Sequence, residues 1–154
     1  APTNTTTQIH TWVLFRYGEV LLNYAEAMNE AYGPDNSAGM GITAREAVNL
    51  IRDRSNMPDF PAGMTQGEFR RKLRNERRVE LAFEDHRFWD IRRWKIGPST
   101  TEIYGMDITR ESDGSFTYQK KLVETRVWEN KMYLYPIPQS EVFKNEALGQ
   151  NPEW

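Results

Sequence analysis

Apolar residues between positions 15 and 32 recur every three or four residues, which is the spacing of an amphipathic α-helix. Leu21, Ala25 and Met28 fall on one face of this helix, and glutamates occupy another face. The Gly33-Pro34 pair ends the pattern, because glycine follows helices readily and proline cannot continue one. The pattern therefore predicts a first helix over residues 15–32.

Two threonines mark the starts of two further helices. Thr43 and Thr65 each stand three residues before a glutamate, which is the spacing of a capping box. The second of these helices is expected to reach about residue 84, and a shorter fourth helix is predicted over 88–96. The first two helices are joined by a short loop, so they are expected to form an antiparallel, tetratricopeptide-like pair. A single pair buries its apolar faces poorly, and we expect it to stack on helices that lie before residue 1.

The pattern changes after residue 97. Residues 103–127 are rich in β-branched and aromatic residues, and the Asp113-Gly114 pair in their midst is typical of a hairpin turn. One short helix is predicted over 140–146, and the Thr-rich residues 1–12 are predicted to be an extended lead-in. The expected fold is mainly α, with antiparallel helix pairs and a small β-hairpin region near the C-terminus. We expect residues 1–154 to form a single domain, helical over 14–97 and rich in hairpin and loop over 98–154.

Charge and composition narrow the class of protein. The 154 residues carry a net charge of −2, which gives no electrostatic case for nucleic acid as a partner. The chain contains no cysteine, so disulfides, thiolate metal sites and a cysteine nucleophile are excluded for these residues. No run of about 18 apolar residues is present that would cross a membrane.

The densest cluster of charge lies in the predicted third helix. Glu76 and Glu80 share a helical face with Phe69, Leu73 and Phe83, so two carboxylates fall on an otherwise apolar stripe. A buried carboxylate needs a partner. One interpretation is acid–base chemistry or metal binding. The other, which we prefer, is a structural ion-pair network whose members are Arg16, Glu26, Arg52, Arg54, Glu76 and Glu80.

Little else in the chain indicates chemistry. No serine or threonine has an evident histidine partner, no metal-ligand spacing occurs, and no cofactor motif is present, so neither catalysis nor a cofactor is predicted. Tyr104 and Trp128 are weak candidates for rings that stack on sugar. Most aromatic rings of the hairpin region are expected to pack on helices instead.

Several segments together resemble the SusD/RagB family. The resemblance covers about residues 14 to 154 in the family's order. It is carried by five stretches: the Arg-x-x-Glu helix of residues 15–27, the Asn-x-x-Arg-x-Arg helix of residues 48–54, the Glu-Arg-Arg to Arg-Arg-Trp segment of residues 76–94, and the closing segments 134–141 and 150–152. Asp85 departs from the pattern, because glycine is usual at that position. Glu153 departs in the same way.

The resemblance implies a glycan-binding lipoprotein on the bacterial outer membrane. Such a protein binds starch-like or other polysaccharides and oligosaccharides at the cell surface, for import through a SusC-like TonB-dependent transporter. It is held by an N-terminal lipid anchor on a cysteine that this chain lacks. The chain would be the C-terminal portion, mainly scaffold, with the binding residues upstream. Two alternatives remain open: a protein–protein interaction scaffold that binds no sugar, and a carboxylate-based glycoside hydrolase, which would need two carboxylates facing each other across a sugar.

Overall fold

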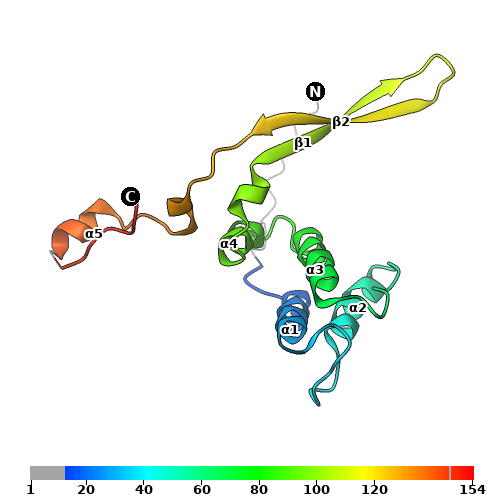
Figure 1. Cartoon of the computed structure of the whole chain (residues 1–154), viewed down its shortest axis with the longest axis horizontal. Coiled ribbons are helices and arrows are strands. Elements are labelled where there is room, and N and C mark those ends of the chain that lie inside the picture. The colour runs from blue at the N-terminus through cyan, green and yellow to red at the C-terminus, as the bar shows by residue number, and fades with distance from the viewer. Residues whose placement is uncertain (1–12, 146) are drawn as a thin grey trace, which may run out of the picture. The chain divides into compact units, whose positions relative to one another are not determined.

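The computed structural model describes residues 13–145 and 147–154, so the lead-in predicted for residues 1–12 lies outside the described residues. The chain forms two compact units, of which the first ends at Arg87 and the second begins at Phe88. The fold is mainly helical with one small antiparallel sheet, as the sequence predicted (Figure 1). The elements follow one another as α1 (Tyr17–Tyr32), α2 (Ala44–Arg54), α3 (Gln66–Glu80), α4 (His86–Arg93), the 3-10 turn η1 (Gly97–Thr100), β1 (Glu102–Arg110), β2 (Phe116–Thr125), the 3-10 turn η2 (Asn130–Tyr133) and α5 (Gln139–Lys144).

The core of the first unit lies where α1 packs against α2 and α3. Each helix contributes one large, fully buried side chain: Leu22 from α1, Val48 from α2 and Phe69 from α3. Burying an aliphatic or aromatic side chain of this size contributes about 1.5–3 kcal/mol. Phe69 also meets the ring of Phe60 edge to face, with 5.8 Å between the ring centroids. This core therefore holds α1, α2 and α3 together as the first unit.

The starts of α2 and α3 are capping boxes, which confirms the prediction from threonine and glutamate spacing. At α2, the Thr43 hydroxyl accepts from the Glu46 backbone N–H at 3.1 Å, and the Glu46 carboxylate accepts from the Thr43 backbone N–H at 2.7 Å. Thr65 and Glu68 form the same reciprocal pair at α3. Each box satisfies two backbone donors that the helix itself leaves without acceptors.

The end of α3 differs from the prediction. The helix stops at Glu80, not near residue 84, and Phe83 is fully exposed instead of lying on the buried stripe. The α-helical ladder ends when the Ala82 N–H donates to the Val79 carbonyl, three residues back, and Arg16 Nη2 then donates to the Glu80 carbonyl oxygen at 2.5 Å. A continued helix would have offered that oxygen to the N–H of Glu84. Instead the chain turns, with Phe83 and Asp85 at φ values of 65° and 62°.

The hairpin of the second unit matches the prediction. β1 pairs antiparallel with β2, and the register shifts between Ile103 and Tyr104. In the turn, Gly114 takes a φ of 86°, and the Asp113 carboxylate accepts from the Ser115 backbone N–H at 2.9 Å. Glycine favours this left-handed conformation because it has no Cβ.

The aromatic rings of the hairpin do not pack as expected. Tyr104, Phe116 and Tyr118 are between 46% and 65% exposed, and β2 is exposed along its whole length. The expectation that most rings here are covered by helices is therefore wrong for these three. A two-stranded ribbon has no second layer of its own, so its rings stay in water unless another element covers them.

Candidate functional site

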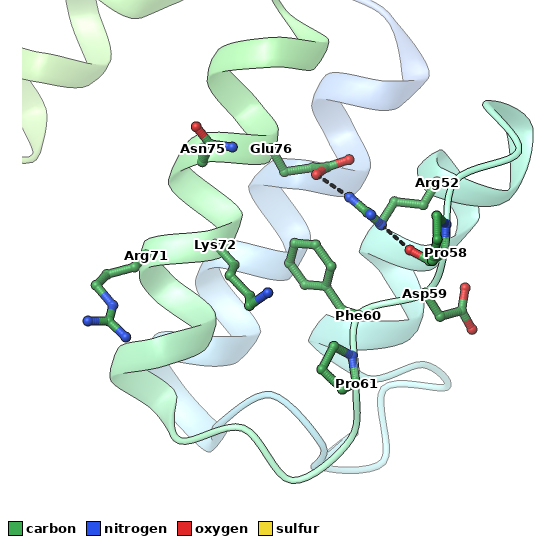
Figure 2. A pocket seen from close by; sticks show the side chains of 9 residues that line it. All are labelled: Arg52, Pro58, Asp59, Phe60, Pro61, Arg71, Lys72, Asn75 and Glu76. Atoms are coloured by element: carbon green, nitrogen blue, oxygen red, sulfur yellow. Dashed lines mark hydrogen bonds and ion pairs between the residues drawn. The ribbon is translucent and has the colours of Figure 1, made fainter. Parts of the chain in front are cut away.

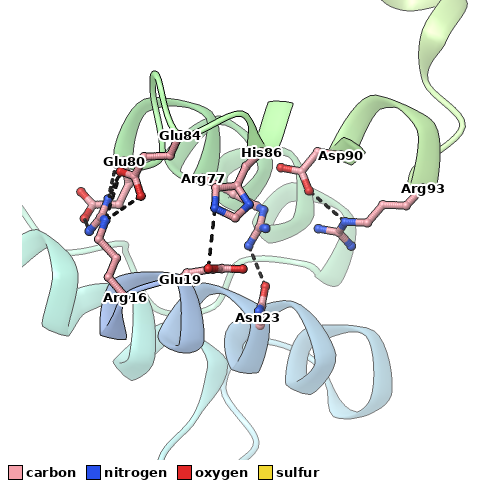
Figure 3. Close-up of polar contacts among 9 residues, drawn as sticks. All are labelled: Arg16, Glu19, Asn23, Arg77, Glu80, Glu84, His86, Asp90 and Arg93. Atoms are coloured by element: carbon pink, nitrogen blue, oxygen red, sulfur yellow. Dashed lines mark hydrogen bonds and ion pairs between the residues drawn. The ribbon is translucent and has the colours of Figure 1, made fainter. Parts of the chain in front are cut away.

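Arg16 is the centre of the charged cluster of the first unit (Figure 3). It is the N-cap residue of α1, and its Nη1 donates to the Glu80 carboxylate at 2.6 Å. Its Nε and Nη2 donate to the Glu84 carboxylate at 3.0 and 2.9 Å. These hydrogen bonds hold the pKa of the Glu84 carboxyl below its ordinary value. The guanidinium therefore ties the start of α1 to the last turn of α3 and to the segment after it.

Two arginines of α2 complete the cluster. Arg52 Nη1 lies 2.6 Å from the Glu76 carboxylate, and Arg54 Nη2 lies 2.6 Å from the Glu80 carboxylate. The Glu76 and Glu80 side chains are only 18% and 13% exposed, so both are mostly withdrawn from water. Buried carboxylates in this setting are held by their cations, and removing either partner is costly.

The structure thus brings five of the six residues of the expected network together: Arg16, Arg52, Arg54, Glu76 and Glu80. Glu26 lies half-buried on α1. Sequence reasoning missed Glu84, because its place on a continued helix gave no sign that Arg16 would reach it. The Glu76 and Glu80 carboxylates are both occupied by guanidinium groups. Among the described residues, no group of three or more acidic, histidine or cysteine side chains is arranged to hold a metal ion.

Further polar contacts join α1 to α3 and the residue that opens α4 (Figure 3). Asn23 accepts a hydrogen bond from Arg77 Nη1 at 2.7 Å. Glu19 lies 3.6 Å from His86 Nε2, and Glu30 pairs with Arg70. The Arg70 guanidinium lowers the pKa of the Glu30 carboxyl. These residues were not singled out from the sequence, and their chemistry is that of helix packing.

A pocket of about 340 Å³ opens between α2, the loop after it and α3 (Figure 2). Phe60 lies at its base, 5% exposed, with the Arg52 guanidinium 4.8 Å and Lys72 Nζ 5.6 Å from its ring centroid. Two cations already lie against this ring, so it offers no free face to a sugar. The remaining walls are mostly charged or proline side chains: Pro58, Asp59, Pro61, Arg71, Asn75 and Glu76. No pattern of residues in the sequence indicated this pocket.

The two weak sugar-stacking candidates lie in the second unit. Tyr104 donates its hydroxyl to Glu102 at 2.5 Å, and Lys120 Nζ stands 3.7 Å above the ring centroid. Trp128 is half-buried and packs so closely on Gly97 that a Cβ there would lie 1.8 Å from the indole. One ring is therefore covered by a cation and the other serves as packing.

A second aromatic group lies in the same unit around Arg92, whose guanidinium is also 5.5 Å from the Trp128 ring centroid, and sequence reasoning did not single it out. Phe88, Trp89 and Tyr135 contact one another, with ring centroids 5.1 to 5.8 Å apart. The Arg92 guanidinium lies 3.4 Å from the Phe88 ring centroid, which is a close cation–π contact. All three rings are partly exposed, between 38% and 56%.

Comparison with known proteins places this architecture in a family. The model of the SusD family matches residues 1–154. SusD-like protein P2 of Formosa agariphila is 33% identical over an alignment 147 residues long that covers 91% of this chain and 25% of that protein. A crystal structure of a SusD-like protein from Bacteroides fragilis superposes with a TM-score of 0.72 at 37% identity, covering 93% of this chain and 26% of that one. The chain belongs to the SusD family.

A more distant solved structure has the same fold. The SusD-like carbohydrate binding protein from Bacteroides vulgatus is 23% identical, with a TM-score of 0.58, over 88% of this chain and 29% of that one. The chain thus spans about a quarter of the length of these relatives. In the part of the chain that the structure describes, no helix combines the length and apolar character needed to cross a bilayer.

Proposed function

We propose that the full-length protein binds glycans at the outer surface of a bacterial cell, and that these 154 residues are mainly scaffold for that activity. The observation that carries the proposal is the match of the SusD family model along the whole chain. The relative from Bacteroides vulgatus, described as a carbohydrate binding protein, supports the same class of ligand.

The finer parts of the proposal follow from the family. The ligand is a starch-like or other polysaccharide or oligosaccharide, and the partner is a SusC-like TonB-dependent transporter that imports it. The protein is a surface lipoprotein of the outer membrane, held by a lipid on an N-terminal cysteine outside these residues. Import needs capture and release of the glycan and no bond cleavage, so the proposal includes no catalytic step.

The contacts of the first unit favour a scaffold role for this part of the protein. A sugar site needs several polar groups that converge beside an aromatic platform and are free to bond the ligand. Here the Glu76 and Glu80 carboxylates are bonded to arginines, and Phe60 lies against two cations. The carboxylates and the cations at Phe60 are therefore engaged in contacts between the helices and the loop and are not free to bind a ligand.

Isothermal titration of two proteins against one panel of oligosaccharides tests the proposal. The full-length protein is expected to bind at least one glycan, and the 154-residue chain is expected to bind it at least about tenfold more weakly, a loss of about 1.4 kcal/mol. Equal affinities would place the binding site within this chain. Absence of binding by the full-length protein to any glycan of a broad panel would favour the alternative, an interaction scaffold without sugar.

A variant of the full-length protein tests whether an exposed aromatic ring of this chain takes part in glycan binding. The Trp89→Ala variant of the full-length protein removes an exposed ring of this chain. If the site lies elsewhere, this variant should bind the glycan as the parent does. A loss of affinity in a variant that unfolds at the parent's temperature would assign the ring to the site and contradict the scaffold role.

A further inference from the structure

The hairpin formed by β1 and β2 (Figure 1) has one apolar side and one polar side. Successive residues of a strand point to opposite sides, and beyond the register shift the even-numbered residues of the two strands share one side. The contacts agree, because Lys120 Nζ stands over the Tyr104 ring on that side and Lys121 pairs with Asp107 on the other. The even-numbered side, which we call the apolar face, carries six apolar side chains: Tyr104, Met106, Ile108, Phe116, Tyr118 and Leu122.

The apolar face is open to water in the part of the chain that the structure describes. Its six apolar side chains are between 46% and 65% exposed. A two-stranded hairpin is at best marginally stable in water without a further layer. The opposite side consists mainly of charged, hydroxyl and amide side chains, which can stay hydrated: Asp107, Thr109, Thr117, Gln119 and Lys121. The apolar face therefore needs a covering layer, whereas the polar side does not.

Charged side chains of opposite sign stand at the two ends of the apolar face. Glu102 begins β1, and its carboxylate accepts a hydrogen bond from the Tyr104 hydroxyl at 2.5 Å, which places it on this side of the hairpin. Arg110 ends β1 and lies directly opposite Phe116, on the same side. Both charged residues are exposed. They lie about 27 Å apart at about 3.4 Å per residue, so the face is acidic at one end and basic beside the turn.

We propose that the apolar face binds the same face of a second copy of this protein, with the two hairpins stacked antiparallel about a two-fold axis. Sheets stacked in this way lie about 10 Å apart, and their side chains interdigitate. With the axis beside Met106, β1 of one copy runs over β1 of the other in the opposite direction. Arg110 of each copy then lies opposite the partner's Glu102, so two complementary charge contacts form together.

The arrangement of charge is what assigns the face to a second copy. A two-fold interface uses the same surface on both partners, so a face with an acid at one end and a base at the other complements itself when one copy is reversed. Lys120 lies opposite Met106 and so comes near the axis. Its ammonium group stands 3.7 Å from the Tyr104 ring centroid, however, so the two lysines lean toward opposite ends of the dimer and away from each other.

The area of the apolar face suits a reversible dimer. A covered aromatic side chain buries about 150–250 Å², so six half-exposed apolar side chains offer roughly 600 Å² on each copy. Specific interfaces between proteins bury about 600–1,000 Å² on each partner. The apolar face reaches the lower end of that range, so we expect a dimer that dissociates on dilution.

Charge exchange in the full-length protein tests the antiparallel arrangement, with the dissociation constant of the dimer measured by sedimentation equilibrium. Arg110→Glu and Glu102→Arg each place like charges together twice and should each raise that constant at least about tenfold. The double variant restores both contacts with reversed sign and should return it to within about threefold of the parent. Lys121→Glu is the matched control, because it changes the charge by the same amount as Arg110→Glu but on the polar side, and it should leave the constant unchanged.

Crosslinking identifies the face that is covered. The 154 residues contain no cysteine, so Met106→Cys introduces a single thiol among them, with other thiols of the full-length protein replaced by serine. A short bismaleimide should join two copies through position 106 beside the axis. Thr109→Cys, on the polar side of the same strand, is the control and should give no crosslinked dimer.

Three results would overturn the proposal. If the full-length protein is monomeric at every concentration and a maleimide modifies the thiol at position 106 as fast as the one at position 109, nothing covers the face. If it is monomeric and only the thiol at position 106 is protected, another part of the same polypeptide covers the face. If the two single charge variants weaken the dimer and the double variant does not restore it, Arg110 and Glu102 do not meet across the axis.

Discussion

Arg16 donates to the carbonyl oxygen of Glu80 at 2.5 Å and so takes the acceptor that the next turn of α3 would have used. The same guanidinium binds the Glu80 and Glu84 carboxylates. One side chain at the start of α1 thus caps the end of α3, bonds the segment after it and neutralises two half-buried acids. Such a group has several consequences that can be measured.

The first prediction is that Arg16→Ala lowers the free energy of unfolding by about 3 kcal/mol, because charged hydrogen bonds are lost and Glu84 is left half-buried without its cation. Glu80→Ala should cost less, since Arg16 keeps Glu84 and the Arg54 side chain is already 62% exposed. Urea-induced unfolding measures both changes. Arg16→Lys should fall between parent and alanine variant, because an ammonium group cannot reproduce the planar fork.

A matched control removes an arginine from a surface pair. Arg126 lies 3.1 Å from Glu124, and both side chains are more than half exposed. Exposed ion pairs contribute about 0–1 kcal/mol, so Arg126→Ala should change the unfolding free energy by less than about 1 kcal/mol. Equal effects of the two alanine variants would show that Arg16 does not have the structural role described.

The second prediction concerns acid. Arginine partners lower the pKa of the Glu84 and Glu30 carboxyls in the folded chain from the ordinary value of 4.5. In the unfolded chain these carboxyls return to that value, so below it the unfolded state binds more protons and stability falls with falling pH. The stabilisation should be complete above about pH 5.5 and should be lost as pH falls through 4.5 and below.

The measurement is the urea midpoint as a function of pH. Glu84→Gln removes one of these titrations and should make the decline below pH 4.5 shallower, although it lowers stability at pH 7. An unchanged slope in this variant would mean that Glu84 is not linked to folding. High salt should weaken the effect for Glu30, whose side chain is 42% exposed, more than for Glu84.

The third prediction concerns the caps. Thr43→Ala and Thr65→Ala each remove the side-chain acceptor of a capping box and should each lower the unfolding free energy by about 1 kcal/mol. Serine keeps the hydroxyl, so Thr43→Ser and Thr65→Ser should restore most of the loss. Thermal unfolding followed by circular dichroism would show this. A serine variant as unstable as the alanine one would indicate that the lost methyl group, and not the hydrogen bond, matters.

The fourth prediction is that the purified chain releases no reducing sugar from any polysaccharide. Hydrolysis needs one carboxylate to donate a proton while a second acts on the opposite side of the sugar. Glu76 and Glu80 lie one turn apart on α3, so they share one wall, and each is bonded to arginine. A reducing-end assay over days measures this. Activity lost in the Glu76→Gln and Glu80→Gln variants would assign it to these carboxylates. Activity that persists in both and stays with the chain through further purification would assign it to other carboxylates, and either result would refute the prediction.

What could be predicted from the sequence was local. The capping boxes at Thr43 and Thr65 and the hairpin turn at Gly114 depend on residues a few positions apart, and all three occur as expected. At the end of α3 the Glu80 carbonyl is bonded by Arg16, which lies 64 residues away in the sequence. Helical periodicity alone continued the stripe to Phe83, because nothing local in the sequence signals a carbonyl captured from a distance.

The candidate site shows the same division. The two carboxylates on the apolar stripe of α3 indicated that arginines would be needed as partners, and Arg16, Arg52 and Arg54 are the ones that bind them. The roles of single aromatic residues could not be predicted. The Trp128 ring packs directly on Gly97, and no sequence pattern around a glycine shows which side chain packs on it. The exposed rings of Trp89 and Tyr135 likewise depend on tertiary packing.

The last prediction follows from that glycine. A Cβ at Gly97 would lie 1.8 Å from the Trp128 indole, far inside van der Waals contact, so Gly97→Ala forces the ring out of place. The ring is also packed against Tyr133, with 5.1 Å between centroids, which leaves it little room to shift. Overpacking of this kind costs about 1–3 kcal/mol. The signal should appear as a loss of near-ultraviolet circular dichroism from the second unit.

A double-mutant cycle identifies the cause. In a Trp128→Ala background the obstructing ring is gone, so Gly97→Ala should cost much less than in the parent, and the two changes should be strongly non-additive. Gly149→Ala is the matched control, because nothing lies within 4 Å of a Cβ added there, and it should change stability by less than about 0.5 kcal/mol. If Gly97→Ala is equally costly with and without the indole, its effect comes from the backbone of the turn and not from Trp128.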